Sequence, residues 1–117
     1  MKLEELTVYK MAMDIGERVW QMVDPWNYFE KDTISKQLVK AVDSVAANIS
    51  EGFGRYHYKE TRHFGNYARG SLFETKAWLT KAYNRNLVSE EEYYQFDRDI
   101  KTIGVKLNNY IKSIGKS

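Results

Sequence analysis

The clearest helical pattern in the chain lies in residues 34–54, which read ISKQLVKAVDSVAANISEGFG. Apolar residues recur here at steps of three and four, which places them on one face of a helix. They are Ile34, Leu38, Ala41, Val45 and Ile49. Asp32 or Thr33 is expected to cap the start of this helix. Gly52 and Gly54 are expected to end it, because glycine tolerates the left-handed turn that closes many helices.

Three further segments show the same spacing. The first begins at Thr7, which can cap it, and stops before Pro25. The third helix is expected from about Tyr58 to Arg85, with Asn86 in a left-handed cap. The last follows Ser89-Glu90-Glu91-Glu92, where Ser89 and Glu92 form a capping box, and its apolar seam ends at Ile114.

These four helices, joined by short loops, predict an all-α fold, an up-down-up-down four-helix bundle. No segment alternates with period two for long enough to predict a strand, and residues 1–117 are expected to form a single domain. The apolar seams should meet in one core. Six side chains are expected to be largely buried there: Ile15, Val19, Trp78, Phe96, Ile100 and Leu107.

The composition narrows the function classes. The 117 residues are 43% hydrophobic and 29% charged, which is typical of a globular protein. There is no cysteine, which excludes a disulfide scaffold and a cysteine nucleophile. Glu60 and His63 have the spacing of one half of a di-iron motif, but the chain holds no second copy. We therefore expect no metal, no cofactor, no catalytic residues and no enzymatic activity.

The location is also predicted from the composition. No apolar run approaches the about 18 residues that a membrane span requires, so we expect no membrane partner. The acidic start of the chain lacks the apolar core of a signal peptide. The sequence therefore predicts a cytoplasmic protein.

Positive charge is concentrated in one part of the chain. The formal net charge is only +2, yet residues 52–85 carry seven basic and two acidic side chains. The candidate nucleic-acid-binding residues come from this part: Arg55, Lys59, Arg62 and Arg69. Tyr56, His57 and Tyr58 stand beside the first two and offer stacking surfaces for unpaired bases. An ordinary solvated helix face is the alternative.

Two polar residues fall at inner positions of the predicted helices. Asn48 continues the inner face of the second helix, and Ser71 lies on that of the third. A buried asparagine needs hydrogen-bond partners. Either Asn48 satisfies backbone groups near the helix end, or a structural polar network forms. The network residues would be Asn48, Glu51, Ser71 and Glu74, with Arg69 as a further partner.

Aromatic residues make up 15% of the chain, more than a slim four-helix core can hold. Several should be exposed in a single subunit, and exposed aromatic residues often mark interfaces. The residues expected at a subunit interface are Trp20, Trp26, Tyr28, Phe29 and Phe53. Scattered surface tyrosines are the alternative.

The run Gln37–Arg55 resembles the signature of the 23S rRNA intervening sequence proteins, also called four helix bundle proteins. In that signature a glutamine and a hydrophobic residue precede a small-residue stretch and Ser-Ile, then Asn-Ile-Ala-Glu-Gly and an arginine. Lys59-Glu60 with Phe64, and Ala68–Leu72 with Glu74, resemble its second block. Leu6–Tyr9 resembles the opening Leu-x-Val-Trp, with Tyr9 in place of tryptophan, and Asn86 replaces a glycine.

The resemblance implies a bacterial four-helix bundle that closes into a homopentameric ring and has no established catalytic residues. Accessory proteins of diversity-generating retroelements are similar, and those partner a reverse transcriptase and nucleic acid through a strongly basic surface. Our leading hypothesis is a non-enzymatic homo-oligomer that binds RNA or DNA, or a nucleic-acid enzyme such as a reverse transcriptase. The alternative is an interaction or scaffold oligomer with no nucleic-acid role.

Overall fold

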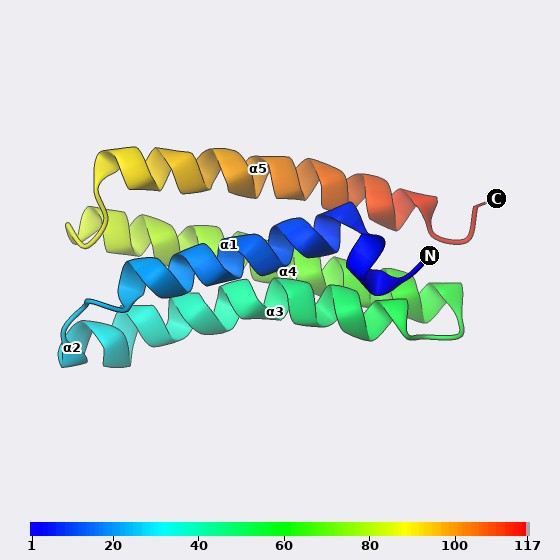
Figure 1. The fold of residues 1–117 in the computed structure, drawn as a ribbon, viewed down its shortest axis with the longest axis horizontal. Coiled ribbons are helices and arrows are strands. Elements are labelled where there is room, and N and C mark those ends of the chain that lie inside the picture. Colours follow the sequence, from blue (N-terminus) through cyan, green and yellow to red (C-terminus); the bar gives the residue numbers. More distant parts are fainter. Residues whose placement is uncertain (117) are drawn as a thin grey trace.

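Four long helical segments run antiparallel along the molecule in the computed structural model, which describes residues 1–116 (Figure 1). A short 3-10 helix, Leu3–Glu5, precedes them. The segments are α1 (Thr7–Val23), then α2 (Tyr28–Glu30) continued by a π-helical stretch (Lys31–Ser35) and α3 (Lys36–Phe53), then α4 (Tyr58–Asn84) and α5 (Glu90–Ser113). The predicted all-α, up-down-up-down four-helix bundle is confirmed.

The long helices are arranged in a ring around the core. α1 packs against α3 and α5, and α4 packs against the same two helices from the other side. The result is a rod of 47 × 23 × 20 Å whose loops lie at its two ends (Figure 1). Because each helix has two neighbours, the α1/α3 side and the α4/α5 side of the rod face in opposite directions.

The buried side chains form one hydrophobic cluster to which every long helix contributes. Five of the six residues expected in the core are buried there: Ile15, Val19, Phe96, Ile100 and Leu107. Trp78 is only half-buried, and its indole nitrogen donates to Glu74 at 3.2 Å. The stripe on α4 is instead completed by Leu72 and Leu79, because α4 must pack against α3 and α5 together.

The second helical segment begins earlier than the sequence pattern predicts. Asn27, not Asp32 or Thr33, caps it, and the Asn27 side chain accepts from the Glu30 amide at 2.9 Å. The Glu30 carboxylate in turn accepts from the Asn27 amide at 3.2 Å. Helical hydrogen bonding then continues through the π-helical stretch into α3, so Asp32 lies within the helical segment.

The reason for glycine at the end of α3 also differs from the prediction. Gly54 has φ −81°, an ordinary right-handed value, and Gly52 lies inside the helix. A Cβ added at Gly52 would lie 2.7 Å from the Phe64 Cβ and 3.1 Å from the Thr61 carbonyl oxygen. Gly52 is therefore required by the close approach of α3 and α4, not by a left-handed turn.

The connection between α4 and α5 follows the prediction closely. Asn86 is in the left-handed region with φ 62°, the conformation that asparagine tolerates better than most residues. The Ser89 hydroxyl accepts from the Glu92 amide at 3.1 Å. In the expected capping box the Glu92 side chain would also accept from the Ser89 amide. Here Glu92 accepts from the Ser89 hydroxyl instead, at 3.2 Å.

No helix within residues 1–116 combines the length and the apolar character that crossing a membrane would need.

Substitution of Gly52 by alanine should destabilise the protein, because the new methyl group would overlap the Phe64 Cβ, which is tied to the backbone. We expect Gly52→Ala to lower the free energy of unfolding by about 1–3 kcal/mol in urea titrations followed by circular dichroism. The matched control is Gly70→Ala in α4, where a Cβ meets nothing within 4 Å. That change should stabilise by up to about 1 kcal/mol through helix propensity. Equal effects of the two substitutions would contradict the packing argument.

Candidate functional site

The connection between α3 and α4 gathers exposed aromatic and basic side chains at one end of the rod. Tyr56 is 92% exposed and Tyr58 is 63% exposed. The rings of Tyr56 and His57 meet edge to face with centroids 5.0 Å apart. Lys59 and Arg62 follow on the exposed first turns of α4. We call Arg55, Tyr56, Tyr58, Lys59 and Arg62 the basic end.

Arg55 is held in place by contacts to both flanking helices. Its guanidinium pairs with Glu51 at 2.6 Å and with Glu60 at 3.7 Å. It also lies over the Phe64 ring, 4.8 Å from the centroid. These contacts orient Arg55, and the two carboxylates offset part of its charge.

Arg62 ties the C-terminal residues to the basic end. Its guanidinium donates to the Ile114 carbonyl at 3.2 Å. Gly115 follows with φ +83°, and a Cβ there would lie 3.1 Å from the Tyr58 ring and 3.3 Å from the Arg62 Nη1. Lys116 is thereby brought beside the basic end. The sequence pattern does not indicate this, because 52 positions separate Arg62 from Ile114.

Arg69 does not join the other three predicted basic residues. It lies further along α4, and its guanidinium donates to the Asn108 side chain on α5 at 3.1 Å. The pairing with Glu51 or Glu74 that the sequence left open is not the one observed. The structure therefore brings Arg55, Lys59 and Arg62 to one end of the rod and places Arg69 on the α4/α5 side.

The four residues considered for a polar network have separate partners. Asn48 donates to the Ser44 carbonyl one turn back at 2.8 Å, which is the backbone-satisfying alternative. Glu51 binds Arg55, and Glu74 accepts from Trp78. The Ser71 carbonyl accepts from the Thr75 hydroxyl at 2.8 Å. Within residues 1–116 no hydrogen bond joins any two of the four.

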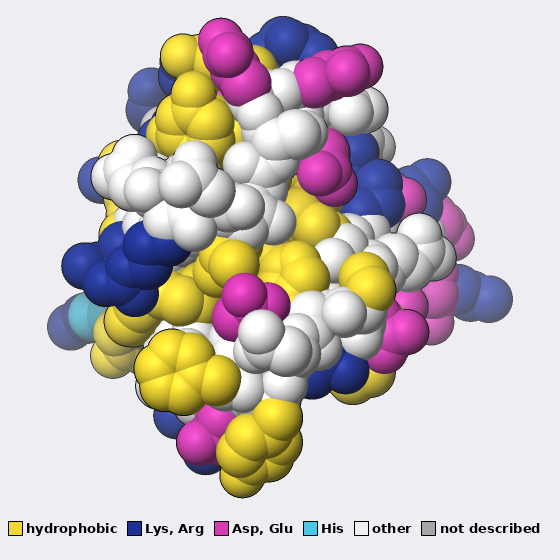
Figure 2. Space-filling view, turned by 90° about the vertical axis from the view of Figure 1, so that its left-hand side faces the viewer, with side chains coloured by type: hydrophobic (Ala, Val, Ile, Leu, Met, Phe, Trp, Pro, Cys, Tyr) yellow, Lys and Arg dark blue, Asp and Glu magenta, His cyan; other side chains and the backbone are white. Residues whose placement is uncertain are grey.

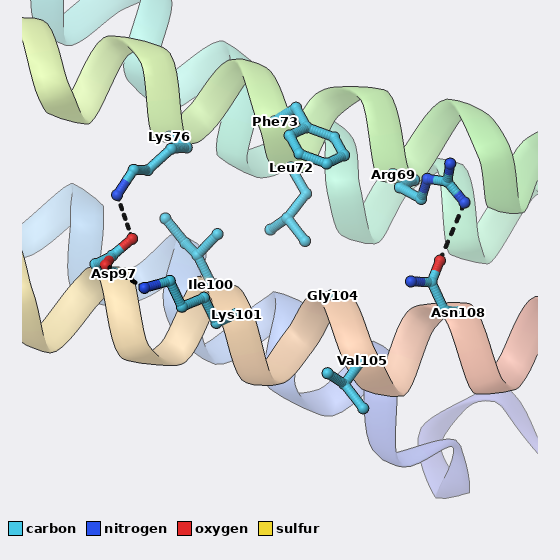
Figure 3. A pocket seen from close by; sticks show the side chains of 10 residues that line it. All are labelled: Arg69, Leu72, Phe73, Lys76, Asp97, Ile100, Lys101, Gly104, Val105 and Asn108. Atoms are coloured by element: carbon cyan, nitrogen blue, oxygen red, sulfur yellow. Dashed lines mark hydrogen bonds and ion pairs between the residues drawn. The ribbon is translucent and has the colours of Figure 1, made fainter.

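A groove of about 570 Å³ runs between α4 and α5. Leu72 and Ile100 point toward one another across it, and Arg69 with Asn108 closes one end (Figure 3). Phe73 and Val105 line it while being 70% and 60% exposed. The groove is thus apolar along its length and carries basic groups at its ends.

The other end of the groove is formed by an ion cluster. Asp97 on α5 accepts from the Lys76 ammonium on α4 and pairs with Lys101 at 3.1 Å (Figure 3). The hydrogen bond from Lys76 lowers the pKa of the buried Asp97 carboxyl, against the effect of burial. Lys76 also lies over the Tyr93 ring, 4.8 Å from its centroid, and the Tyr93 hydroxyl meets Thr80 at 3.0 Å. This cluster joins α4 to α5 at this end of the groove.

The opposite end of the rod, around α2, presents hydrophobic groups to solvent. Figure 2 shows this end, where hydrophobic side chains project at the bottom of the view among charged groups. Three of the residues expected at an interface are exposed: Trp20, Tyr28 and Phe29. Trp26, also expected at an interface, is half-buried, and Phe53 is half-buried at the other end of the rod, where α3 ends.

The sequence model of the family described as "23S rRNA-intervening sequence protein" matches residues 4–109. The chain belongs to this family. The match includes α1, α3, α4 and most of α5, and it includes the connection that carries Arg55, Lys59 and Arg62. No curated protein matches the chain.

The chain also matches a solved structure, a protein of unknown function from the S23 ribosomal protein family of Bacteroides thetaiotaomicron VPI-5482. The TM-score is 0.83 at 22% sequence identity, and the match covers 91% of this chain and 96% of the other. At this identity the likeness shows the shared fold.

The lowered pKa of Asp97 predicts that the stability of the protein depends on pH. A carboxyl group whose pKa is lower in the folded than in the unfolded state stabilises the folded protein. This contribution is complete above the unfolded-state pKa of about 3.9 and is lost as the pH falls through the folded-state pKa. Asp97→Asn should lower the free energy of unfolding by about 1–3 kcal/mol at pH 7. The difference from wild type should shrink below about pH 4.

Urea titrations from pH 7 to pH 2.5 would measure this difference, and Lys76→Met should reproduce the loss at pH 7 because it removes the principal partner of Asp97. A difference between wild type and Asp97→Asn that stays constant over the whole range would contradict the assignment.

Proposed function

We propose that this protein is a non-enzymatic homo-oligomer that binds nucleic acid through the basic end. The observation that carries the proposal is the juxtaposition of exposed tyrosine rings with cations that have no carboxylate partner. Within residues 1–116, no carboxylate lies within ion-pair distance of Lys59 or Arg62. Tyr56 and Tyr58 stand immediately beside them.

These side chains suit an unpaired strand or loop of RNA or DNA. A guanidinium or ammonium group contacts phosphate oxygens, and an exposed aromatic ring stacks on an unpaired base. Lys116 adds a further cation, held nearby by the Arg62 contact to Ile114. The ligand class that fits best is therefore single-stranded or looped nucleic acid, because the bases of a regular duplex are stacked inside it.

Assembly would strengthen a contact that is small on one subunit. In a ring each basic end repeats around the axis, and several weak contacts to one strand add up to a higher avidity. The exposed Trp20, Tyr28 and Phe29 support association, because a soluble monomer seldom displays so many large apolar groups. Family membership supports a ring of five subunits through the resemblance described above.

A scaffold oligomer without nucleic acid is the second candidate. It is favoured by the two carboxylates, Glu51 and Glu60, that offset the charge of Arg55. It predicts the same assembly with no binding at the basic end. A binding experiment therefore distinguishes the two candidate functions, whereas a measurement of mass does not.

The assembly is tested by size exclusion coupled to light scattering at micromolar concentration. We expect a mass of about five times the 13.8 kDa of one chain. The physical reason is the exposed apolar surface, which association would remove from water. A mass of 13.8 kDa would show a monomer and would remove the ring from the proposal.

Binding is tested by titrating a structured RNA and a single-stranded DNA with the wild type and with an Arg55→Glu, Lys59→Glu, Arg62→Glu variant at several salt concentrations. We expect the wild type to bind more weakly as salt rises, because phosphate contacts release counterions. The triple variant should lose at least about tenfold in affinity while it stays oligomeric.

The matched control is Lys31→Glu, Lys40→Glu, Arg85→Glu, which changes the net charge equally at exposed positions away from the basic end. It should retain most of the wild-type affinity. Equal losses in the two variants would mean that binding follows overall charge only. An oligomeric wild type that binds neither ligand would favour the scaffold candidate.

A further inference from the structure

We propose that copies of this chain join head to tail through opposite sides of the bundle. The α1/α3 side of one copy, where Glu17 and Asp43 form an acidic hollow, would pack against the α4/α5 side of the next, where cations border an apolar groove. This inference rests on the oligomer proposed above and names the two surfaces that form it. It does not depend on nucleic-acid binding.

The basic side is the α4/α5 groove. Its apolar part includes Phe73 and Val105, both mostly exposed in the single chain. The cations at its margins are Arg69, which has a neutral amide partner, and Lys101, whose side chain is 76% exposed. An apolar strip between cations is suited to a partner that presents apolar groups flanked by carboxylates.

The acidic side is a shallower hollow of about 340 Å³ between α1 and α3. Met13 and Ala47 line it together with the carboxylates of Glu17 and Asp43. Asp43 approaches α1 closely, because Gly16 leaves room: a Cβ at Gly16 would lie 2.9 Å from the Asp43 Oδ1. This hollow therefore presents the complementary pattern of small or apolar side chains beside negative charge.

The two carboxylates lack a cation of their own. Within residues 1–116, no lysine or arginine lies within ion-pair distance of Glu17 or Asp43. Burial and the neighbouring charge of Glu17 raise the pKa of Asp43, so its ionised form is not fully compensated inside the subunit. A cation from another copy would offset the repulsion between the carboxylates of Glu17 and Asp43.

Glu17 and Asp43 lie at the same height along the rod as Lys101, as side-by-side packing in a ring with its axis parallel to the helices requires. Arg18, next to Glu17, binds Asp99 on α5 at 2.7 Å, and Asp99 is two residues from Lys101. Asp97 in turn binds Lys76, near Phe73 on α4. Glu17 and Asp43 are therefore level with Lys101, whereas Arg69, which binds Asn108 seven positions beyond Lys101 on α5, lies about 10 Å nearer the basic end.

Electrostatics favours head-to-tail contacts over symmetric ones. A two-fold contact would place like charges opposite each other, either Glu17 and Asp43 against themselves or Arg69 and Lys101 against themselves, which is unfavourable. Head-to-tail contacts close into a ring when the rotation between copies allows it. A side of the rod spans 47 by about 20 Å, enough for the about 800 Å² that each partner buries in a standard interface.

The test is a charge exchange read by light scattering coupled to size exclusion. Glu17→Lys with Asp43→Lys should convert the oligomer to monomer at micromolar concentration, and so should Arg69→Glu with Lys101→Glu. The variant with all four substitutions should regain the wild-type mass, because its two sides attract again with exchanged signs. Glu4→Lys with Glu5→Lys, which adds the same charge at exposed residues outside both sides, should stay oligomeric.

A second measurement avoids large changes of charge. The chain has no cysteine, so Glu17→Cys with Lys101→Cys creates the only two thiols. They lie on opposite sides of one bundle, so a short bis-maleimide should link different copies and produce a ladder of covalent multimers. Glu4→Cys with Lys101→Cys should give far less linkage.

Each result bears on a separate claim. A monomeric wild type would overturn this inference together with the proposed oligomer. An oligomeric wild type whose two charge variants also stay oligomeric would overturn the assignment of these two sides and leave the oligomer standing. Failure of the four-substitution variant to reassemble, when circular dichroism shows it folded and no thiol ladder forms, would likewise overturn it.

Discussion

The close approach of α3 and α4 at Gly52 is the constraint on which the candidate site depends. The absence of a side chain there lets the Phe64 side chain and the Thr61 carbonyl come against α3. The same contact places the Phe64 ring beneath Arg55 and brings Glu51 and Glu60 to either side of its guanidinium. The exposed connection with Tyr56 is thus presented from a rigid base, which is how loops acquire a defined geometry.

The net charge of the chain is near neutral, but its acidic and basic groups lie on different surfaces of the molecule. Acidic groups without partners lie on the α1/α3 side, and cations lie at the margins of the α4/α5 groove. A further set of cations occupies the basic end. Net charge indicates solubility and long-range attraction, whereas binding depends on where the charges are placed. A small total charge is therefore compatible with both a charged interface and a nucleic-acid contact.

Prediction from the sequence succeeded where the signal was local. The spacing of Leu38 and Val45, the left-handed Asn86 and the Ser89 cap all depend on residues a few positions apart. The true start of the second segment also had a local signal, since Asn27 and Glu30 have the spacing of a capping box, but it lay upstream of the apolar pattern. The burial of Trp78 was predicted wrongly, because the spacing of apolar residues defines a broad stripe on the helix and does not show which residues lie at its centre.

The amino-acid sequence alone determined the four helices, their antiparallel order and the presence of excess aromatic residues, because helical periodicity and chain connectivity are local properties. Only the packed structure decided which charges meet. Arg62 reaches Ile114, Arg69 reaches Asn108 and Lys76 reaches Asp97 across separations of 52, 39 and 21 positions. Such pairs depend on the axial register and rotation of one helix against another, which are set by side-chain packing in the core and leave no periodic trace in the sequence.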